Sequence, residues 1–354
     1  MRPCSRIYSR EPALASPLQK GGKFMTSQIQ VTGPLPGARF GATVRLSEPL
    51  GTELPTGLPQ ALADAGGLLL IPGLGDIGRE PQLLVKLSYL FGTEVENYRA
   101  ILKSPMLSHP SAPEIFMVTN MIPGSPPSPA LPVPPLTPEG RLPVQYPQRF
   151  GWHSDQSYRN PAPDISVLYA QTPVARGRGQ TIFASGTLAY DALPEHLREK
   201  VENLQGMHCK PGAGRDRRSA ESGKPSPALA PDQFATQPVV RIHPVTGKKS
   251  LFLCERAQMD WFDGPFVGMQ PGPDGEGARL LDELLVHYTR PEFTYVHEWT
   301  QGDVLVWDNR CLIHTATWYD AAAEQRMMWR TTVRSDGGAT VPSSMPEVVS
   351  QGAG

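Results

Sequence analysis

The chain has 354 residues, a formal net charge of −1 and a pI near 6.7. This balance gives no reason to expect nucleic acid or an anionic membrane as a partner, and no apolar run approaches the roughly 18 residues of a transmembrane helix. The length fits two average domains or one large β-rich domain. With 39 prolines and 34 glycines, the composition favours a barrel with long connections over a helical bundle.

The cysteines and the N-terminal segment bear on the compartment. The cysteines are scattered and form no C-x-x-C pair, so we expect reduced thiols in a cytoplasmic protein; they are Cys4, Cys209, Cys254 and Cys311. Residues 1–24 are basic and serine-containing, which is typical of a transit peptide. Alternatively translation begins at Met25, and we favour that interpretation. Under either one we expect residues 1–24 to be disordered and irrelevant to catalysis.

The first half of the chain predicts short helices alternating with apolar strands. In chain order we expect a helix at 58–65, a strand at 67–71, an amphipathic helix at 80–90 and a strand at 114–119. A proline-rich insertion at 123–147 follows, and it cannot pair as a central strand. Because it leads directly into the next motif, we expect it to cover the mouth of a site.

The second half predicts mainly strands. We expect strands at 165–171 and 181–184, a helix at 188–204, a mobile loop at 211–237, a hairpin of 239–242 with 249–253, a helix at 277–288, and closing strands at 293–299, 303–307, 311–315 and 327–333. Many short strands separated by turns indicate a closed or sandwiched β architecture. We expect a flexible tail at 336–354.

The chemistry-bearing motif is His153-x-Asp155 together with His314, far downstream. Side chains at i and i+2 of a strand point to the same face, so the first two can converge on one ion. Two histidines and one carboxylate form the facial triad that binds Fe(II) and leaves positions open for cosubstrate and oxygen. By itself the motif is weak, because a chain with eight histidines can contain it by chance.

The flanking residues make the pattern specific. The chain carries WHSDQSY at 152–158, Gly-Gln-Thr at 179–181, WDNRCLIH at 307–314, and then Arg326 and Arg330. In this order they resemble the taurine dioxygenase / 2,4-dichlorophenoxyacetate dioxygenase (TauD/TfdA) family of Fe(II)/2-oxoglutarate-dependent dioxygenases, from about residue 66 to 335. The resemblance implies a mainly β fold with flanking α-helices, a double-stranded β-helix or jelly roll, as one domain over 25–335.

The resemblance also implies roles for particular residues. His153, Asp155 and His314 would bind Fe(II), and Thr181 with Arg326 would hold 2-oxoglutarate, which is consumed with O2 to give succinate and CO2. Further candidates for contact with the substrate are Arg330, Gln156, Asn120, Tyr158, His208 and Trp318. The turn before Arg326 is one residue longer than in taurine dioxygenase, which leaves open how the two arginines divide their roles.

The expected partner is a small-molecule substrate, hydroxylated or oxidatively cleaved, with a homo-oligomer left open. A small organic acid is favoured by Arg330, and an uncharged polar substrate is the alternative. Two other functions remain open. Residues 73–78 read GLGDIG, a dinucleotide-binding pattern after an apolar strand, although Pro72 and the lack of a second buried strand disfavour it. A jelly roll that only binds its ligand is the non-enzymatic alternative.

Overall fold

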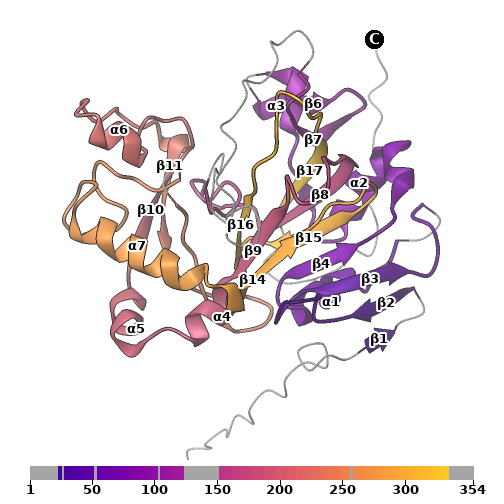
Figure 1. Cartoon of the computed structure of the whole chain (residues 1–354), viewed down its shortest axis with the longest axis horizontal. Helices are drawn as coiled ribbons and strands as arrows, with labels where there is room; N and C mark the ends of the chain where they lie inside the picture. Colours follow the sequence, from indigo (N-terminus) through magenta and orange to yellow (C-terminus); the bar gives the residue numbers. More distant parts are fainter. Residues whose placement is uncertain are drawn as a thin grey trace, which may run out of the picture.

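The computed structural model describes residues 23–25, 28–51, 54–102, 104–122, 151–255 and 258–334. Figure 1 shows a β-rich body with a helical lobe at its side. The body contains a large sheet in the order β1-β2-β3-β4-β15-β8-β17-β7-β6, with β5 paired to β17, and a smaller sheet in the order β14-β9-β16. The hairpins β10–β11 and β12–β13 complete the strands of the described ranges.

The element bounds follow the chain. The strands of the large sheet are β1 Lys23–Met25, β2 Ile29–Thr32, β3 Ala42–Leu46, β4 Leu68–Ile71, β5 Glu94–Val95, β6 Ser108–His109, β7 Ala112–Thr119, β8 Ile165–Thr172, β15 Val304–Asp308 and β17 Met327–Arg334. The other strands are β9 Thr181–Ser185, β10 Gln205–Cys209, β11 Phe234–Pro238, β12 Val240–Ile242, β13 Lys249–Leu251, β14 Thr294–His297 and β16 Leu312–Ala316. The helices are α1 Leu58–Asp64, α2 Gln82–Tyr89, α3 Tyr98–Ile101, α4 Gly186–Asp191, α5 Glu195–Val201, α6 Arg217–Glu221 and α7 Glu276–Tyr288.

The central strands are apolar on both faces because each face packs against a different layer. In β15 (VLVWD, all buried), Val304 and Val306 join the core that contains the leucines of α2. The alternate residues Leu305 and Trp307 join the core shared with Phe183 of the smaller sheet. Side chains alternate across a strand, so one sequence run supplies both layers. The two sheets therefore face one another across a packed interior.

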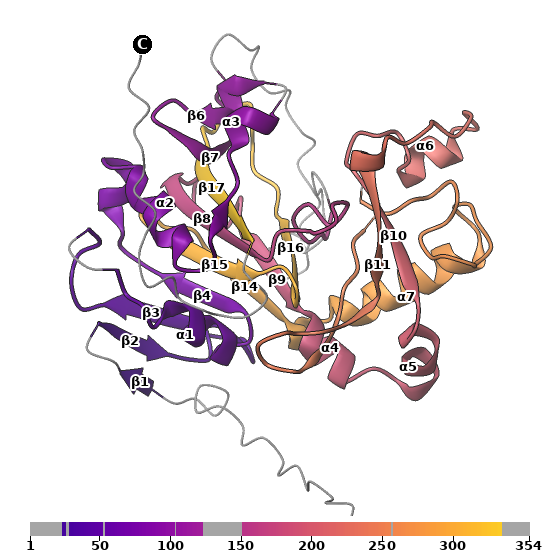
Figure 2. The same cartoon turned by 180° about the vertical axis from the view of Figure 1, so that it is seen from behind.

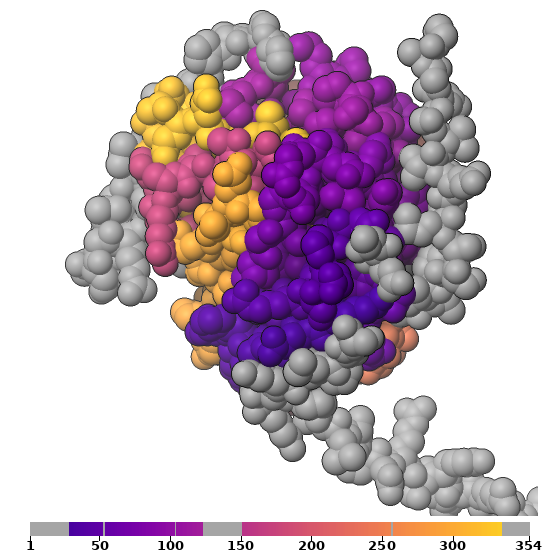
Figure 3. Space-filling model, turned by 90° about the vertical axis from the view of Figure 1, so that its right-hand side faces the viewer, coloured from indigo at the N-terminus to yellow at the C-terminus, as the bar shows by residue number. Residues whose placement is uncertain are grey.

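Segments from the N-terminal and C-terminal parts of the described chain pair with each other in the large sheet. Strand β4 pairs antiparallel with β15, in register from Val304 opposite Ile71 to Trp307 opposite Leu68. Figure 3 shows the consequence on one face, where indigo and purple N-terminal residues lie beside orange and yellow C-terminal ones. Residues from these two parts of the chain thus enclose the same core.

The lobe has its own core. Helix α7 buries Leu280, Leu281, Leu284 and Leu285 along one side, which is the 3.6-residue spacing of an amphipathic helix. These leucines pack with residues of α4, α5 and the β12–β13 hairpin. Figure 2 shows β10, β11, α5, α6 and α7 standing together beside the strands of the body.

Most predicted elements are present, and two predictions were wrong. The expected helix at 188–204 is two helices, α4 and α5, because Pro194 at the start of α5 lacks the N–H that a continuous helix needs. The expected loop at 211–237 contains α6 and ends in β11, which pairs with an unpredicted strand, β10. The structure also excludes the dinucleotide-binding alternative that the sequence disfavoured, because β4 pairs parallel only with β3, and β5, after α2, pairs antiparallel with β17.

Several predictions concern segments outside the described residues. These are the insertion at 123–147, the tail at 336–354 and most of 1–24, although β1 begins within that last segment, at Lys23. The described cysteines, at 209, 254 and 311, are free thiols and buried. In the described ranges, none of the helices combines the length and hydrophobicity needed to cross a bilayer.

The junction of α4 with the lobe yields a stability prediction. A Cβ on Gly186 would lie 2.4 Å from the Tyr288 hydroxyl and 2.5 Å from the Leu251 carbonyl oxygen. We expect Gly186→Ala to lower the free energy of unfolding by about 1–3 kcal/mol, the usual cost of overpacking. Urea denaturation measures it, with Gly75→Ala as control because a Cβ there meets nothing within 4 Å. Equal stability of the two variants would contradict the packing described.

Candidate functional site

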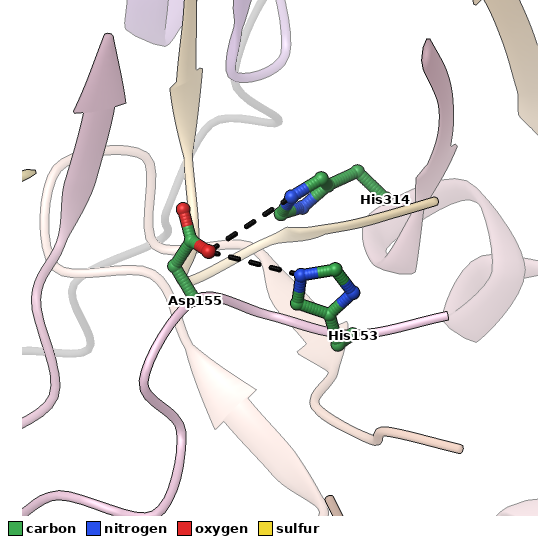
Figure 4. A group of neighbouring side chains, drawn as sticks. All are labelled: His153, Asp155 and His314. Atoms are coloured by element: carbon green, nitrogen blue, oxygen red, sulfur yellow. Dashed lines mark ion pairs between the residues drawn. The ribbon is translucent and has the colours of Figure 1, made fainter. Parts of the chain in front are cut away.

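Two histidines face each other across an isolated antiparallel bridge. His153 donates its backbone N–H to the His314 carbonyl at 3.0 Å, and His314 donates to the His153 carbonyl at 2.8 Å. The ring centroids lie 4.2 Å apart. Asp155 follows two residues after His153, and its Oδ1 lies 3.8 Å from His153 Nε2 and 3.9 Å from His314 Nε2. Figure 4 shows the three side chains pointing toward a common centre.

The donor atoms of this group suit one metal ion. One nitrogen or oxygen from each residue lies within 4.8 Å of the others. The His153 Nδ1 lies 3.0 Å from the Gly151 carbonyl oxygen, so that nitrogen carries the proton and Nε2 keeps its lone pair. Fixing the tautomer in this way is what a hydrogen bond outside the ligand set does in metal sites.

The protonation states also suit metal binding. Burial lowers the pKa of His153, and burial with the neighbouring His153 ring lowers the pKa of His314 to about 3. Burial by itself would raise the pKa of Asp155, but Arg330 and the two imidazoles outweigh it and lower that pKa to about 2. At neutral pH the group is therefore two neutral imidazoles and one carboxylate, the forms that ligate metals.

Asp155 is held by residues of the opposite sheet. Its Oδ2 accepts a hydrogen bond from the Ser166 hydroxyl at 2.7 Å, and Ser166 in turn accepts from the Asn309 amide at 2.9 Å. The Asn309 side-chain oxygen accepts from the Asp155 backbone N–H at 3.2 Å and from the Trp307 indole at 3.0 Å. These buried bonds fix both the backbone and the carboxylate of Asp155.

Arg330 lies directly beside the group. Its Nη1 donates to Asp155 Oδ1 at 2.7 Å, the oxygen that faces both histidines. The guanidinium lies 5.1 Å from the Phe116 ring centroid and 5.9 Å from that of Tyr98. Although burial would lower the pKa of Arg330, the Asp155 carboxylate raises it, so the side chain stays charged.

Arg326 and Thr181 lie among other residues than those that surround Asp155 and Arg330. Arg326 is buried, with Nη2 3.5 Å from the Gly179 carbonyl oxygen and the guanidinium 5.7 Å from the Tyr319 ring centroid. Thr181 accepts from the Trp299 indole at 3.0 Å. It shares a face of β9 with Phe183, whose ring stacks on His314, so that face points toward the candidate metal site.

The remaining residues that the sequence suggested for substrate contact lie in different parts of the structure. Gln156 is buried and donates to Glu96 at 2.7 Å, and Tyr158 is partly buried, with a pKa that burial raises to about 12. Trp318 is buried. His208 lies in the lobe and contacts the ligand-bearing segment through Ser157, whose hydroxyl lies 3.0 Å from the His208 Nδ1.

Asn120 has another task in this structure. Its amide donates to the carbonyl oxygens of Ala321 and Glu324 at 2.9 and 2.7 Å, and its oxygen accepts from the Arg326 N–H at 2.8 Å. Both ends of the amide are therefore used in shaping the turn that carries Arg326. A role in holding that turn explains the residue without any contact to substrate.

Sequence reasoning missed the residues that support Asp155 and Arg330. Asn309 stands inside the WDNR run, so its position was visible but its bond to Asp155 was not. Ser166, Tyr98 and Glu96 carry no local signal, because only the sheet pairing brings them beside the site. Tyr98 accepts from Arg330 Nη2 at 3.4 Å and from Gln156 at 3.3 Å.

A second cluster resembles a metal site only in composition. His243, Asp308 and Cys311 bring donor atoms within 4.8 Å of one another. However, Asp308 already accepts from Arg310 and, at 2.9 Å, from His243 Nε2, while backbone N–H groups of Val245 and Thr246 lie 3.2 Å from His243 Nδ1. The cluster is explained by the buried ion pair of Arg310 with Asp308, to which His243 donates a hydrogen bond.

The support for Asp155 yields a prediction. Ser166→Ala removes the donor to Asp155 Oδ2, and we expect the affinity for Mn(II), a spectroscopic substitute for Fe(II), to fall roughly 10- to 100-fold, as for other residues that orient ligands. Titration followed by the Mn(II) EPR signal measures it. Ser250→Ala, a buried serine of the lobe, is the control and should bind Mn(II) as the unchanged protein does. Unaltered affinity of Ser166→Ala would show that this hydroxyl does not orient a ligand.

Comparisons with known proteins agree with this architecture. The family described as "Taurine catabolism dioxygenase TauD, TfdA family" matches residues 30–332. An (S)-phenoxypropionate/alpha-ketoglutarate-dioxygenase of Sphingobium herbicidovorans is 34% identical over 191 residues, 53% of this chain and 63% of that protein. An alpha-ketoglutarate-dependent 2,4-dichlorophenoxyacetate dioxygenase of Cupriavidus pinatubonensis is 35% identical over 187 residues, 51% and 59% of the two chains. The matches thus span about three fifths of these relatives.

A solved structure extends the likeness over most of the chain. The crystal structure of AAD-2 in complex with Mn(II) and N-oxalylglycine has a TM-score of 0.60 and 26% identity, covering 87% of this chain and 97% of that one. The mainly β, jelly-roll fold expected from the sequence is thereby confirmed. The chain belongs to the TauD/TfdA family of dioxygenases.

Proposed function

We propose that this protein is an Fe(II)- and 2-oxoglutarate-dependent dioxygenase that hydroxylates or oxidatively cleaves a small organic acid. The observation that carries the proposal is the convergence of His153, Asp155 and His314 within 4.8 Å. Family membership supports it, as does the likeness to a protein crystallised with Mn(II) and N-oxalylglycine. A binding-only jelly roll would not need two neutral imidazoles and an ionised carboxylate kept buried together.

The residues fit the proposed ion. Two imidazole nitrogens and one carboxylate oxygen are the donor set of non-haem iron(II) oxygenases. His153 Nε2 is left free by the bond at Nδ1, and Asp155 Oδ1 faces both rings while Oδ2 is engaged by Ser166. Ser166 and Asn309 would keep the carboxylate in place as an ion arrives or leaves.

Bound iron with 2-oxoglutarate would supply the oxidising chemistry, in which one oxygen atom of O2 would enter succinate, formed with CO2, and the other would enter the substrate. Arg326 and Thr181 would hold the distal carboxylate of 2-oxoglutarate from the side of β9. A guanidinium suits this task because its parallel N–H groups match a carboxylate. The burial of Arg326 would strengthen the contact by excluding competing water.

Arg330 supports an acidic substrate. It lies beside the proposed ligand Asp155 and stays charged, and it is flanked by the rings of Phe116 and Tyr98. A carboxylate or sulfonate would gain from this cation, while the aromatic surfaces and Trp318 would favour a planar or bulky remainder. The phenoxypropionate and dichlorophenoxyacetate dioxygenases among the relatives act on acids of this shape by their names.

The proposal predicts the effect of removing single ligands. His153→Ala or Asp155→Ala should abolish succinate formation while the far-UV circular dichroism stays unchanged, because stability comes mainly from the apolar cores. Activity is measured as substrate-dependent succinate release over aryloxy acids, sulfonates, sulfate esters and neutral amides. Wild-type turnover by either variant would refute the triad assignment. Turnover confined to neutral compounds would refute only the proposal that the substrate is an acid.

Alanine variants of Arg326 and Arg330 should change different KM values in steady-state kinetics. Arg326→Ala removes a charge-assisted contact worth about 1.5–3 kcal/mol, so the KM for 2-oxoglutarate should rise about 10- to 100-fold. Arg330→Ala should instead raise the KM for the organic acid. Measuring both KM values for both variants decides the assignment. The reverse pattern would exchange the roles of the two residues.

A further inference from the structure

The segment that follows the proposed metal ligands adopts an unusual backbone conformation. Gln156, next to Asp155, has φ +50°, and among the described residues no other non-glycine residue has a positive φ. Such a conformation persists only where its surroundings over-determine it, and it is frequent at functional sites. The positive φ at Gln156 therefore raises the question of which contacts hold residues 154–159, here called the ligand turn.

The β10–β11 hairpin holds the ligand turn from outside. The Gln237 side-chain amide of β11 donates to the carbonyl oxygens of Ser157 and Arg159, both at 2.9 Å. Its own oxygen accepts from Arg241, whose guanidinium lies 3.5 Å from the Phe252 ring centroid. Gln237 is 5% exposed, and its bond to the Ser157 carbonyl is buried while its bond to the Arg159 carbonyl is partly buried. Loss of this donor would therefore leave a buried carbonyl oxygen without its amide partner.

A second contact runs from β10. Ser157 donates its hydroxyl hydrogen to Gln258 at 3.1 Å, so it accepts from His208, whose Nδ1 lies 3.0 Å away. Burial lowers the pKa of His208 to about 3, which keeps the ring neutral with its proton available for this bond. Both strands of the hairpin thus bind Ser157: β10 contacts its hydroxyl and β11 contacts its carbonyl oxygen.

The body of the protein holds the inner side of the same turn. Gln156 and Arg159 both donate to Glu96, and Gln156 also donates to Tyr98. Tyr98 contacts Arg330, which contacts Asp155. In Figures 1 and 2 the segment that precedes β8 lies between the hairpin and the strands of the body. The ligand turn is therefore clamped between two parts of the fold.

We propose that Gln237 is a positioning residue for the active site: by binding two carbonyls of the ligand turn, it fixes the strained conformation that aims Asp155 at the metal and Gln156 and Arg159 at Glu96. This inference rests on the proposed function for its consequence in catalysis. Its structural part, that a residue of the hairpin orders the ligand turn, stands apart from it. The hairpin thereby becomes part of the active-site support.

The substitution Gln237→Glu separates this role from simple packing. A glutamate keeps the volume and places a carboxylate against Arg241, so a residue that only packed or bound Arg241 would be replaced without loss. The two carbonyl oxygens, however, would face an acceptor in place of a donor. The matched control is Gln205→Glu on β10, because the side chain of Gln205 makes no hydrogen bond to the ligand turn in the described part of the chain.

The first measurement is hydrogen–deuterium exchange on metal-free protein. In Gln237→Glu the peptide covering residues 152–159 should exchange at least about tenfold faster than in the unchanged protein, since local opening becomes easier. Peptides of β15 and α7 should stay unchanged, as should every peptide of Gln205→Glu. Exchange of 152–159 at the unchanged rate would overturn the proposal. If the glutamate variant fails to fold, Gln237→Asn, whose amide is one methylene too short, replaces it with the same expected increase.

The second measurement links the turn to the site. Folded Gln237→Glu should bind Mn(II) roughly tenfold more weakly, like other losses of groups that orient ligands. Its kcat should fall while its KM for 2-oxoglutarate stays within about twofold, because Arg326 is not in the turn. Unchanged Mn(II) affinity together with faster exchange would overturn the link to catalysis. Failure of the unchanged protein to bind Mn(II) would refute the proposed function. The exchange data would still decide whether Gln237 orders the ligand turn.

Discussion

The backbone bridge between His153 and His314 is the constraint on which the site depends. Two reciprocal hydrogen bonds set these residues directly opposite each other, with ring centroids 4.2 Å apart. Opposed residues of an antiparallel pair place their side chains on the same face. The segment before β8 therefore has one acceptable register against β16, since a shift by one residue would turn one ring away. The apolar cores on either side of the central strands stabilise that register.

Once the two histidines are fixed, the fold must keep a carboxylate buried next to them. An isolated buried charge is costly, and it persists when it is paired and hydrogen bonded. Asp155 obtains its cation from Arg330 on β17, its carboxylate accepts a hydrogen bond from Ser166, and its backbone N–H donates to the Asn309 side chain. The same oxygen of Asp155 that faces the histidines contacts Arg330, so this arginine and an incoming metal ion would share one acceptor. The charge of Arg330 thus connects the proposed ligand set with the proposed substrate.

The polar contacts do not stop at the ligands. Arg330 is hydrogen bonded to Tyr98, and Tyr98 to Gln156. Gln156 is in turn hydrogen bonded to Glu96 and Arg159. In a buried network of this kind the hydrogen bonds strengthen one another. The members of this network come from three separate regions of the chain, which explains why changes distant from the proposed ion are expected to alter its binding.

The sequence predicted what depends on local periodicity and on motifs. The strand at β15 and the amphipathic helix α7 were found because apolar spacing is a local property. The proposed ligand set, whose three side chains the structure brings together, was suggested because His153 and Asp155 stand two residues apart in a recognisable run. Prediction failed where tertiary contacts decide, as in β10, whose strand conformation depends on pairing with β11. The supporting role of Gln237 was equally hidden, because its two acceptors lie about 80 residues earlier in the chain.

The central claim is that this site binds iron and 2-oxoglutarate together, and an anaerobic titration of the purified protein tests it directly. Adding Fe(II) and then 2-oxoglutarate should produce the weak visible charge-transfer band of the chelate, saturating at one equivalent of each per chain. The band should require both additions and should disappear on treatment with a chelator. Its absence from well-folded protein, under conditions where both components are in excess, would contradict the account.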